Sequence, residues 1–267
     1  MKTITFILLV ISLNCYSQSA EEYFKRGNEK FKSEDYRGAI NDYTKAIELN
    51  LKYSSLFYNR ALAKTKLKDH KGAIIDFTYV IEMEPEFVIA YYNRGLSKSD
   101  LDDYRGAIAD YSKAIELNPK FVVAYYNRGL SKSKLDDYRG AIADYSNAIE
   151  LNPKDADAYL SRGKVKYILD DYRGAIADYS KAIELNPKDA DAYLNRGAAK
   201  NILEDYRGAI VDLNKAIELD PKDAIAYMSR GITKIGLGQK ESGCLDLSKA
   251  GELGSEKAYE VIKQFCN

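Results

Sequence analysis

Apolar residues recur at helical spacing along most of the chain, and short polar breaks separate one helical stretch from the next. One such stretch covers 88–101, where the apolar positions follow a single helix face until Asp102 and Asp103 interrupt it. A second periodic stretch covers 104–117 and ends before Pro119. Asp103 is a good N-cap for this second stretch, because its carboxylate can accept the unpaired backbone N–H groups of the first turn. The pattern therefore predicts two helices joined by a short turn.

This pair of helices returns along the chain at a constant distance. The segment DYRGAI, once written DHKGAI, recurs at steps of 34 residues, with its first residue at Asp35, Asp69, Asp103, Asp137, Asp171 and Asp205. A fixed period of this length is typical of a solenoid, in which each repeat packs only against its neighbours and cannot bury its apolar face alone. The five prolines share one slot of the period, so no proline-rich linker divides the chain. The sequence therefore predicts one array of copied helix pairs.

The residues that recur in each repeat also carry a family resemblance. One repeat has the segment Tyr91-x-x-Arg94-Gly95, followed in its second helix and the next turn by Ala107, Tyr111, Ala114 and Pro119. This arrangement resembles the tetratricopeptide pattern W-x-x-L-G, A-x-x-x-F, A and P, which has the same period. The resemblance covers about 230 of the 267 residues. It implies an all-α fold, a right-handed α–α superhelix of the tetratricopeptide solenoid type, in an exported bacterial protein.

We expect the chain to contain three segments. They are a signal peptide at 1–17, seven tetratricopeptide repeats at 20–253, of which the last is degenerate, and a C-terminal capping helix at 254–267. The capping helix is predicted because its apolar residues follow the spacing of one helical face, at Ala258, Val261, Ile262 and Phe265. Such a helix covers the stacking surface that the last repeat would otherwise expose.

The first residues differ in kind from the repeats. Lys2 precedes the apolar run 4–13, and the small residues Cys15 and Ser17 follow it, which is typical of a secretory signal peptide cut before Gln18. The run is short for a membrane span. Lipidation of Cys15, after a poor lipobox, and an uncleaved N-terminal anchor are the alternatives. We therefore expect a periplasmic or secreted protein with no integral membrane segment in the mature chain.

Catalytic chemistry finds little support in the sequence. The only histidine, His70, occupies a slot that holds tyrosine in five other repeats, which favours packing over a role as base or ligand. The glycine of DYRGAI has neither the neighbouring glycines nor the following Lys-Ser/Thr that a phosphate-binding loop requires. A glutamate in place of Gly106 would have completed a capping box, so the choice of glycine is not explained by helix capping alone. No Cys/His cluster has metal-ligand spacing. We predict that the protein is not an enzyme and has no cofactor or metal.

The charge of the chain argues against one class of partner. Its formal net charge is zero, and no segment carries a basic run or stripe. Nucleic-acid binding relies on such a basic surface to hold the phosphates. We therefore expect no nucleic-acid partner.

Two charged series keep the period of 34 residues. Arginine stands in place of the family's leucine, at Arg26, Arg60, Arg94, Arg128, Arg162, Arg196 and Arg230. An aspartate series keeps the same step, at Asp42, Asp76, Asp110, Asp144, Asp178, Asp212 and Asp246. In a helix hairpin that turns near Asp103, Arg94 and Asp110 lie at similar heights, so we predict bidentate pairing inside each repeat. The alternative is an arginine ladder that binds anions.

Two cysteines remain if export removes the third. Cys244 lies in the second helix of the last repeat, and Cys266 lies at the end of the capping helix that should fold back against it. We predict a disulfide between Cys244 and Cys266, with two separately buried thiols as the alternative.

The family resemblance implies that the first helices of the repeats line a concave groove. It places the groove positions at Tyr58, Asn59, Leu62, Tyr92, Asn93, Leu96, Tyr126, Asn127 and Leu130, with Asn195 as a continuation after a break at Ser161. Asparagine offers both a donor and an acceptor to a peptide backbone, while tyrosine and leucine can bury apolar side chains. We therefore expect a monomeric, non-enzymatic scaffold that binds an extended, uncharged and partly apolar segment of a protein or peptide.

Two further interpretations follow from the same positions. The carboxylate-clamp subfamily uses lysine and arginine where this chain has Phe24, Ile89 and Asn93, so a charged C-terminal tail is not the expected ligand. The alternative function is a structural spacer or assembly element that acts through its ends or its convex face. In that case the tyrosines and leucines only pack against neighbouring repeats.

Overall fold

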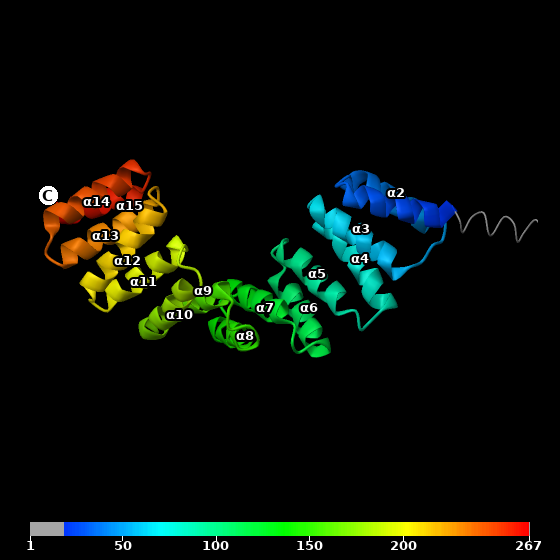
Figure 1. The fold of residues 1–267 in the computed structure, drawn as a ribbon, viewed down its shortest axis with the longest axis horizontal. Helices are drawn as coiled ribbons and strands as arrows, with labels where there is room; N and C mark the ends of the chain where they lie inside the picture. Colours follow the sequence, from blue (N-terminus) through cyan, green and yellow to red (C-terminus); the bar gives the residue numbers. More distant parts are fainter. Residues whose placement is uncertain (1–18, 267) are drawn as a thin grey trace, which may run out of the picture. The chain divides into compact units, whose positions relative to one another are not determined.

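The computed structural model describes residues 19–266, which fold into consecutive α-helices joined by short turns (Figure 1). The first helix covers 19–32 of these residues. It is followed by α2 (Tyr36–Glu48), α3 (Ser54–Lys66), α4 (His70–Met83), α5 (Val88–Ser99), α6 (Tyr104–Leu117), α7 (Val122–Lys134) and α8 (Tyr138–Leu151). The remaining helices are α9 (Ala156–Ile168), α10 (Tyr172–Leu185), α11 (Ala190–Ile202), α12 (Tyr206–Leu219), α13 (Ala224–Gly236), α14 (Lys240–Glu252) and α15 (Glu256–Phe265).

The described residues contain no strand, which confirms the predicted all-α class and its two-helix repeat. Two compact parts can be distinguished, an N-terminal part that ends at Ser131 and a C-terminal part that begins at Lys132. The predicted signal peptide at 1–17 lies outside the described residues. Between residues 19 and 266, no helix combines the length and the apolar character that crossing a bilayer requires.

The turn inside each helix pair explains why glycine follows the arginine of DYRGAI. Asp102 has a positive φ of 59°, and the next residue, Asp103, caps α6 by accepting a hydrogen bond from the backbone N–H of Gly106 at 2.9 Å. A Cβ atom at Gly106 would lie 2.1 Å from Oδ2 of Asp103. The capping carboxylate therefore occupies the space of a side chain at Gly106, and a glutamate there would displace it.

The interior of each hairpin is built from small residues around one aromatic ring. In the α5–α6 hairpin, Ala107, Tyr111 and Ala114 are fully buried. Gly95 faces the ring of Tyr111 so closely that a Cβ atom there would lie 2.7 Å from a ring carbon. The small residues let the two helices approach, and burial of the large ring stabilises the hairpin by about 2 kcal/mol.

A buried ion cluster joins the two helices of the hairpin and connects it to the preceding repeat. Arg94 Nε and Nη2 donate to Asp110 Oδ2 and Oδ1 at 3.0 and 2.7 Å. Arg94 Nη1 donates to Thr78 Oγ1 of the preceding repeat at 3.1 Å. Lys98 Nζ lies 2.8 Å from Asp110 Oδ2, so the buried carboxylate has two cationic partners.

The same bidentate pairing is seen in five other repeats, for Arg26–Asp42, Arg60–Asp76, Arg162–Asp178, Arg196–Asp212 and Arg230–Asp246. The predicted pairing is confirmed for these repeats. The lysine was missed by the sequence analysis, although it keeps the same 34-residue step as the arginine.

Candidate functional site

The predicted groove positions of the N-terminal part form contacts between successive first helices. Asn93 Nδ2, on α5, donates to the hydroxyl of Tyr58, on α3, at 3.0 Å. Asn127 Nδ2, on α7, donates to the hydroxyl of Tyr92 at 3.2 Å and to the backbone oxygen of Val123 at 2.8 Å. The structure therefore joins each tyrosine to the asparagine of the next repeat, and part of the donor capacity of the asparagines is used inside the chain.

The two tyrosines are also packing residues. The ring of Tyr58 lies 5.9 Å from that of Phe77 and 5.3 Å from that of Phe87. Tyr92 packs in the same way, with its ring 5.1 Å from that of Phe121. Burial raises the pKa of both tyrosines, and the hydrogen bond from the asparagine opposes this effect. Both phenols are therefore neutral at physiological pH, and each hydroxyl keeps its own hydrogen for donation.

The other predicted positions differ in what they present. Asn59 Nδ2 donates to Asn28 Oδ1 at 2.9 Å, and Asn195 Nδ2 donates to the backbone oxygen of Asp191 at 2.6 Å. Leu62 packs against the buried cluster of α3 and α4. The remaining positions are half-buried or exposed, at Leu96, Tyr126 and Leu130. Asn59, Asn93, Asn127 and Asn195 thus each donate at least one hydrogen bond within the chain, and their predicted contact with a ligand stays a prediction.

The C-terminal part contains two pockets beside its first helices, one lined by apolar side chains and the other by both apolar and polar side chains. One pocket, of about 180 Å³, is lined by Ile232, Ile235, Gly236, Val261 and Phe265. The other, of about 170 Å³, is lined by Tyr167, Ala198, Asn201, Ile202, Ser229, Ile232 and Thr233. Because both pockets include Ile232, they are neighbours along one surface, which we call the first-helix groove.

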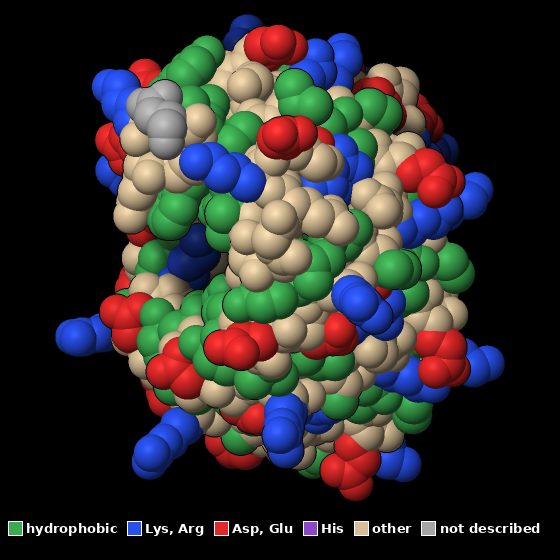
Figure 2. Space-filling model, turned by 90° about the vertical axis from the view of Figure 1, so that its left-hand side faces the viewer, with side chains coloured by type: hydrophobic (Ala, Val, Ile, Leu, Met, Phe, Trp, Pro, Cys, Tyr) green, Lys and Arg blue, Asp and Glu red, His purple; other side chains and the backbone are tan. Residues whose placement is uncertain are grey.

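The first-helix groove lies where helices converge. Within the C-terminal part, α11 contacts both α9 and α13, so the first helices of successive repeats approach one another more closely than the second helices do. The first helices therefore form the inner side of the curvature of this part. Figure 2, which views the molecule from the side where α13, α14 and α15 lie, shows hydrophobic side chains at the surface among charged ones.

The apolar character of the groove comes from departures from the repeat pattern. Ile202 lines one of the pockets and is 42% exposed, and Ile168, at the same slot one repeat earlier, is 52% exposed. The same slot of the first four repeats carries charged residues, at Lys32, Lys66, Asp100 and Lys134. The sequence analysis missed this change, although a comparison of the repeats slot by slot would have found it.

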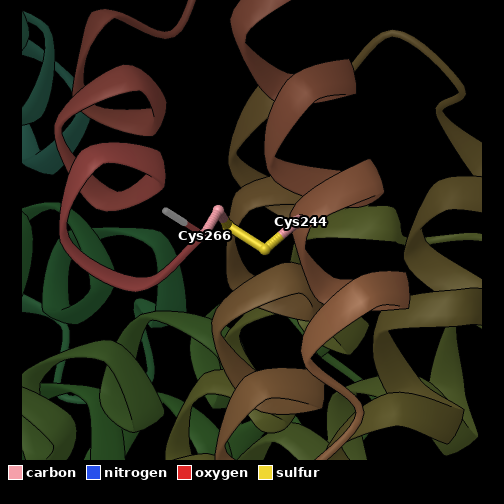
Figure 3. The surroundings of a disulfide bond; sticks show 2 residues. All are labelled: Cys244 and Cys266. Atoms are coloured by element: carbon pink, nitrogen blue, oxygen red, sulfur yellow. A yellow bond between two sulfur atoms is a disulfide. The ribbon is translucent and has the colours of Figure 1, made fainter.

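A disulfide fixes the end of the groove that α15 supplies. Cys244 of α14 and Cys266, directly after α15, are joined, with a Cα–Cα distance of 5.8 Å (Figure 3). Ala258 of α15 is buried. The helical spacing places Phe265 on the same face of α15 as Ala258. Phe265 nevertheless remains 43% exposed, because it lines the apolar pocket beside Ile232 instead of packing against α14.

The positions considered for catalysis hold structural contacts in the described chain. His70 begins α4 and lies with Nδ1 3.3 Å from Asp100 Oδ2. Asp103 and its equivalents cap helices. Among residues 19–266, no group of three or more His, Cys, Asp or Glu side chains is arranged to hold a metal ion.

The comparisons with known proteins agree with this architecture. Tetratricopeptide repeat families match the sequence at 24–86, 88–121, 122–155, 163–200 and 190–223, which together is most of the chain. The chain therefore belongs to the tetratricopeptide repeat family. Its fold is that of a protein-interaction scaffold built from helix pairs. A search of curated proteins finds no significant match.

Solved structures with the same fold include one protein that is described as having a peptide-binding site. YrrB, described as a TPR protein with an unusual peptide-binding site, is 25% identical, with a TM-score of 0.63 over 70% of this chain and 97% of its own. MamA is 27% identical, with a TM-score of 0.61 over 66% of this chain and 96% of its own. A tetratricopeptide repeat protein from Parabacteroides merdae is 24% identical, with a TM-score of 0.67 over 94% of this chain and all of its own, and shows the fold alone.

Proposed function

We propose that the protein binds an extended segment of a partner protein along its first helices, with apolar side chains of that segment in the first-helix groove. The observation that carries this proposal is the pair of neighbouring pockets that share Ile232, of which one is apolar and the other is lined by both apolar and polar side chains. In an extended segment, residues i and i+2 point to the same side and lie about 7 Å apart. Two neighbouring pockets fit two such side chains.

The polar groups beside the pockets suit the backbone of such a segment. Tyr167, Ser229 and Asn201 border the pocket between α9, α11 and α13. The Oδ1 atom of Asn201 is buried and has no hydrogen-bond partner in the described chain. A buried amide oxygen without a donor costs about 1–3 kcal/mol. A backbone N–H of the ligand that draws this amide toward the pocket would recover part of that cost.

In the N-terminal part, the proposed contacts are those of the tyrosine–asparagine pairs. Asn93 and Asn127 use Nδ2 for the bonds to Tyr58 and Tyr92, which leaves their Oδ1 atoms outside these bonds. An Oδ1 atom fixed in this way can accept a hydrogen bond from a backbone N–H of an extended ligand. YrrB, a protein of the same fold at 25% identity, is described as having an unusual peptide-binding site, which supports a peptide as the class of ligand.

We also propose that the protein is exported by the segment 1–17. The Cys244–Cys266 disulfide supports an oxidising compartment, because structural disulfides persist there and are rare in the cytosol.

The test of the groove uses a substitution that the chain already tolerates elsewhere. Ile202→Lys installs the residue that the same slot carries at Lys66 and Lys134, so folding should be preserved. The full chain is screened against an array of peptides with apolar residues at alternate positions, and the affinity of the strongest peptide is measured by fluorescence anisotropy. We expect Ile202→Lys to weaken binding by tenfold or more, since removing one buried isoleucine contact costs about 1.5–3 kcal/mol.

The matched control is Ile225→Lys, which changes an exposed isoleucine of α13 outside both pockets. It should leave the affinity unchanged. An Ile202→Lys protein that is folded and binds as well as the unchanged chain would overturn the groove proposal and favour the spacer function.

A further inference from the structure

The outer face of α4 carries a continuous apolar stripe, which a lysine or an asparagine at the position of Tyr79 interrupts in the other second helices. Ile75, Tyr79 and Met83 follow one another at intervals of four residues, so they lie along one side of the helix. Their exposures are 58%, 48% and 44%. Ile75 and Tyr79 also line a shallow hollow of about 330 Å³, together with Ile74, Thr78 and Glu82. We call Ile75, Tyr79, Met83 and Glu82 the α4 face.

Tyr79 replaces a lysine that has a fixed partner in other repeats. At its slot, five second helices carry a lysine that pairs with the glutamate three residues later, in Lys45–Glu48, Lys113–Glu116, Lys181–Glu184, Lys215–Glu218 and Lys249–Glu252. On α4 the equivalent glutamate, Glu82, makes no ion pair within residues 19–266. The ring of Tyr79 instead rests against that of Phe57 at 5.3 Å, which holds the tyrosine in place at the surface.

The turn after α4 is also unlike its equivalents. It reads Glu84-Pro85-Glu86, whereas the next turn reads Asn118-Pro119-Lys120 and three later turns also carry lysine after proline. With Glu82, this region therefore holds three carboxylates and no lysine. The same slots one repeat later, from Lys113 to Lys120, hold two lysines and one carboxylate. Apolar and acidic character have thus replaced the basic surface that the same slots form one repeat later.

We propose that the α4 face binds an amphipathic helix of a partner protein, whose apolar stripe packs on Ile75, Tyr79 and Met83 and whose flanking lysine or arginine residues face Glu82, Glu84 and Glu86. An exposed helix with apolar residues four apart offers a ridge beside which a second helix packs. The three carboxylates supply the charge complementarity that orients a basic partner and speeds its association.

The same charges exclude other occupants of this face. A second copy of the chain bound symmetrically through this face would bring its own carboxylates against these, because a two-fold interface places the same patch on both sides. An anionic membrane surface would be repelled as well. The α4 face shares no residue with the first-helix groove, so this inference goes beyond the proposed function and does not depend on it.

The test replaces the α4 face with the residues of the next repeat. In the triple variant Ile75→Ala, Tyr79→Lys and Glu86→Lys, each new residue is the one found at Ala109, Lys113 and Lys120. The full-length protein is titrated with a fluorescein-labelled synthetic helix that has leucine at every third or fourth position and lysine beside the leucines. Two further peptides serve as comparisons, one with glutamate in place of lysine and one with the same composition in scrambled order.

We expect the basic helix to bind the unchanged chain, the triple variant to bind it at least tenfold more weakly, and added salt to weaken binding to the unchanged chain. The acidic and the scrambled peptides should not bind. Val211→Ala, at the slot of Ile75 on α12, is the control and should have no effect. The proposal is overturned if the basic helix does not bind at up to about 100 µM, if the triple variant binds it undiminished, or if the scrambled peptide binds equally.

Discussion

The ion cluster of the α5–α6 hairpin allows a prediction whose size follows from its contacts. Replacing Arg94 with methionine removes two hydrogen bonds to the buried carboxylate of Asp110 and one to Thr78. Breaking a buried ion pair costs about 3–5 kcal/mol when the remaining charge has no partner. Here Lys98 stays 2.8 Å from the carboxylate, so we expect a loss near the lower end, about 3 kcal/mol.

The partner substitution completes a double-mutant cycle. Asp110→Leu alone leaves the cations of Arg94 and Lys98 without their acceptor, and it should destabilise by a similar amount. In the double variant the methionine and the leucine can pack together, while Lys98, which is partly exposed, extends its ammonium group to water. We expect the double variant to be more stable than the sum of the single losses by about 1–3 kcal/mol.

The assay must resolve a single hairpin, because repeat arrays lose cooperativity between distant repeats. Hydrogen exchange of peptides from α5 and α6, read by mass spectrometry, reports the free energy of local opening, and urea unfolding of the whole chain accompanies it. Arg105→Met, on the exposed side of α6, serves as the control and should have no effect on either measurement. Additive losses in the cycle would refute direct coupling between Arg94 and Asp110.

Three further predictions concern groups elsewhere in the chain. Tyr111→Phe removes a buried hydroxyl that has no hydrogen-bond partner in the described chain and should raise stability by about 1 kcal/mol. Tyr43→Phe removes a hydroxyl that donates to Asn28 Oδ1 at 2.9 Å, and it should lower stability by a similar amount. Urea midpoints that shift in the same direction for the two variants would contradict this reasoning. Reduction of the Cys244–Cys266 disulfide, which closes a loop with a sequence separation of 22, should cost about 3 kcal/mol and speed hydrogen exchange in α15. Exchange in α15 that is indifferent to reductant would contradict a stabilising disulfide.

The local elements could be predicted from the sequence because the same signals recur in every repeat. The stretch predicted at 104–117 is the helix α6 (Tyr104–Leu117), since Asp103 and Pro119 mark its two ends. The first helix of the same pair was predicted at 88–101 but ends at Ser99, because the turn begins before the polar break and Leu101 belongs to it.

The contacts that depend on geometry could not be predicted in the same way. The glycine at Gly106 follows from the position of the Asp103 carboxylate, which no spacing rule gives. The asparagines were expected to face a ligand, and the bond from Asn93 to Tyr58 joins residues 35 positions apart across two repeats. A groove along the first helices was predicted, but the pockets at Ile202 and Ile232 and the α4 face were missed, because the prediction used the residues that the repeats share and they lie at positions where the repeats differ.

The hydrogen bond from each arginine to the preceding repeat has a consequence for how such a chain can change in length. Arg60, Arg94, Arg128, Arg162, Arg196 and Arg230 each donate through Nη1 to the side chain 16 residues before, on Thr44, Thr78, Ser112, Ser146, Ser180 and Asn214. Each internal repeat thus has an arginine that donates to the preceding repeat and a Thr, Ser or Asn side chain that accepts from the arginine of the following repeat. Duplication or loss of a 34-residue block joins compatible surfaces, so evolution can vary the number of repeats without redesigning a junction. The blocks that are not interchangeable are those with a changed surface, such as α4 and the first helices after Lys134, and selection on a partner would act on them individually.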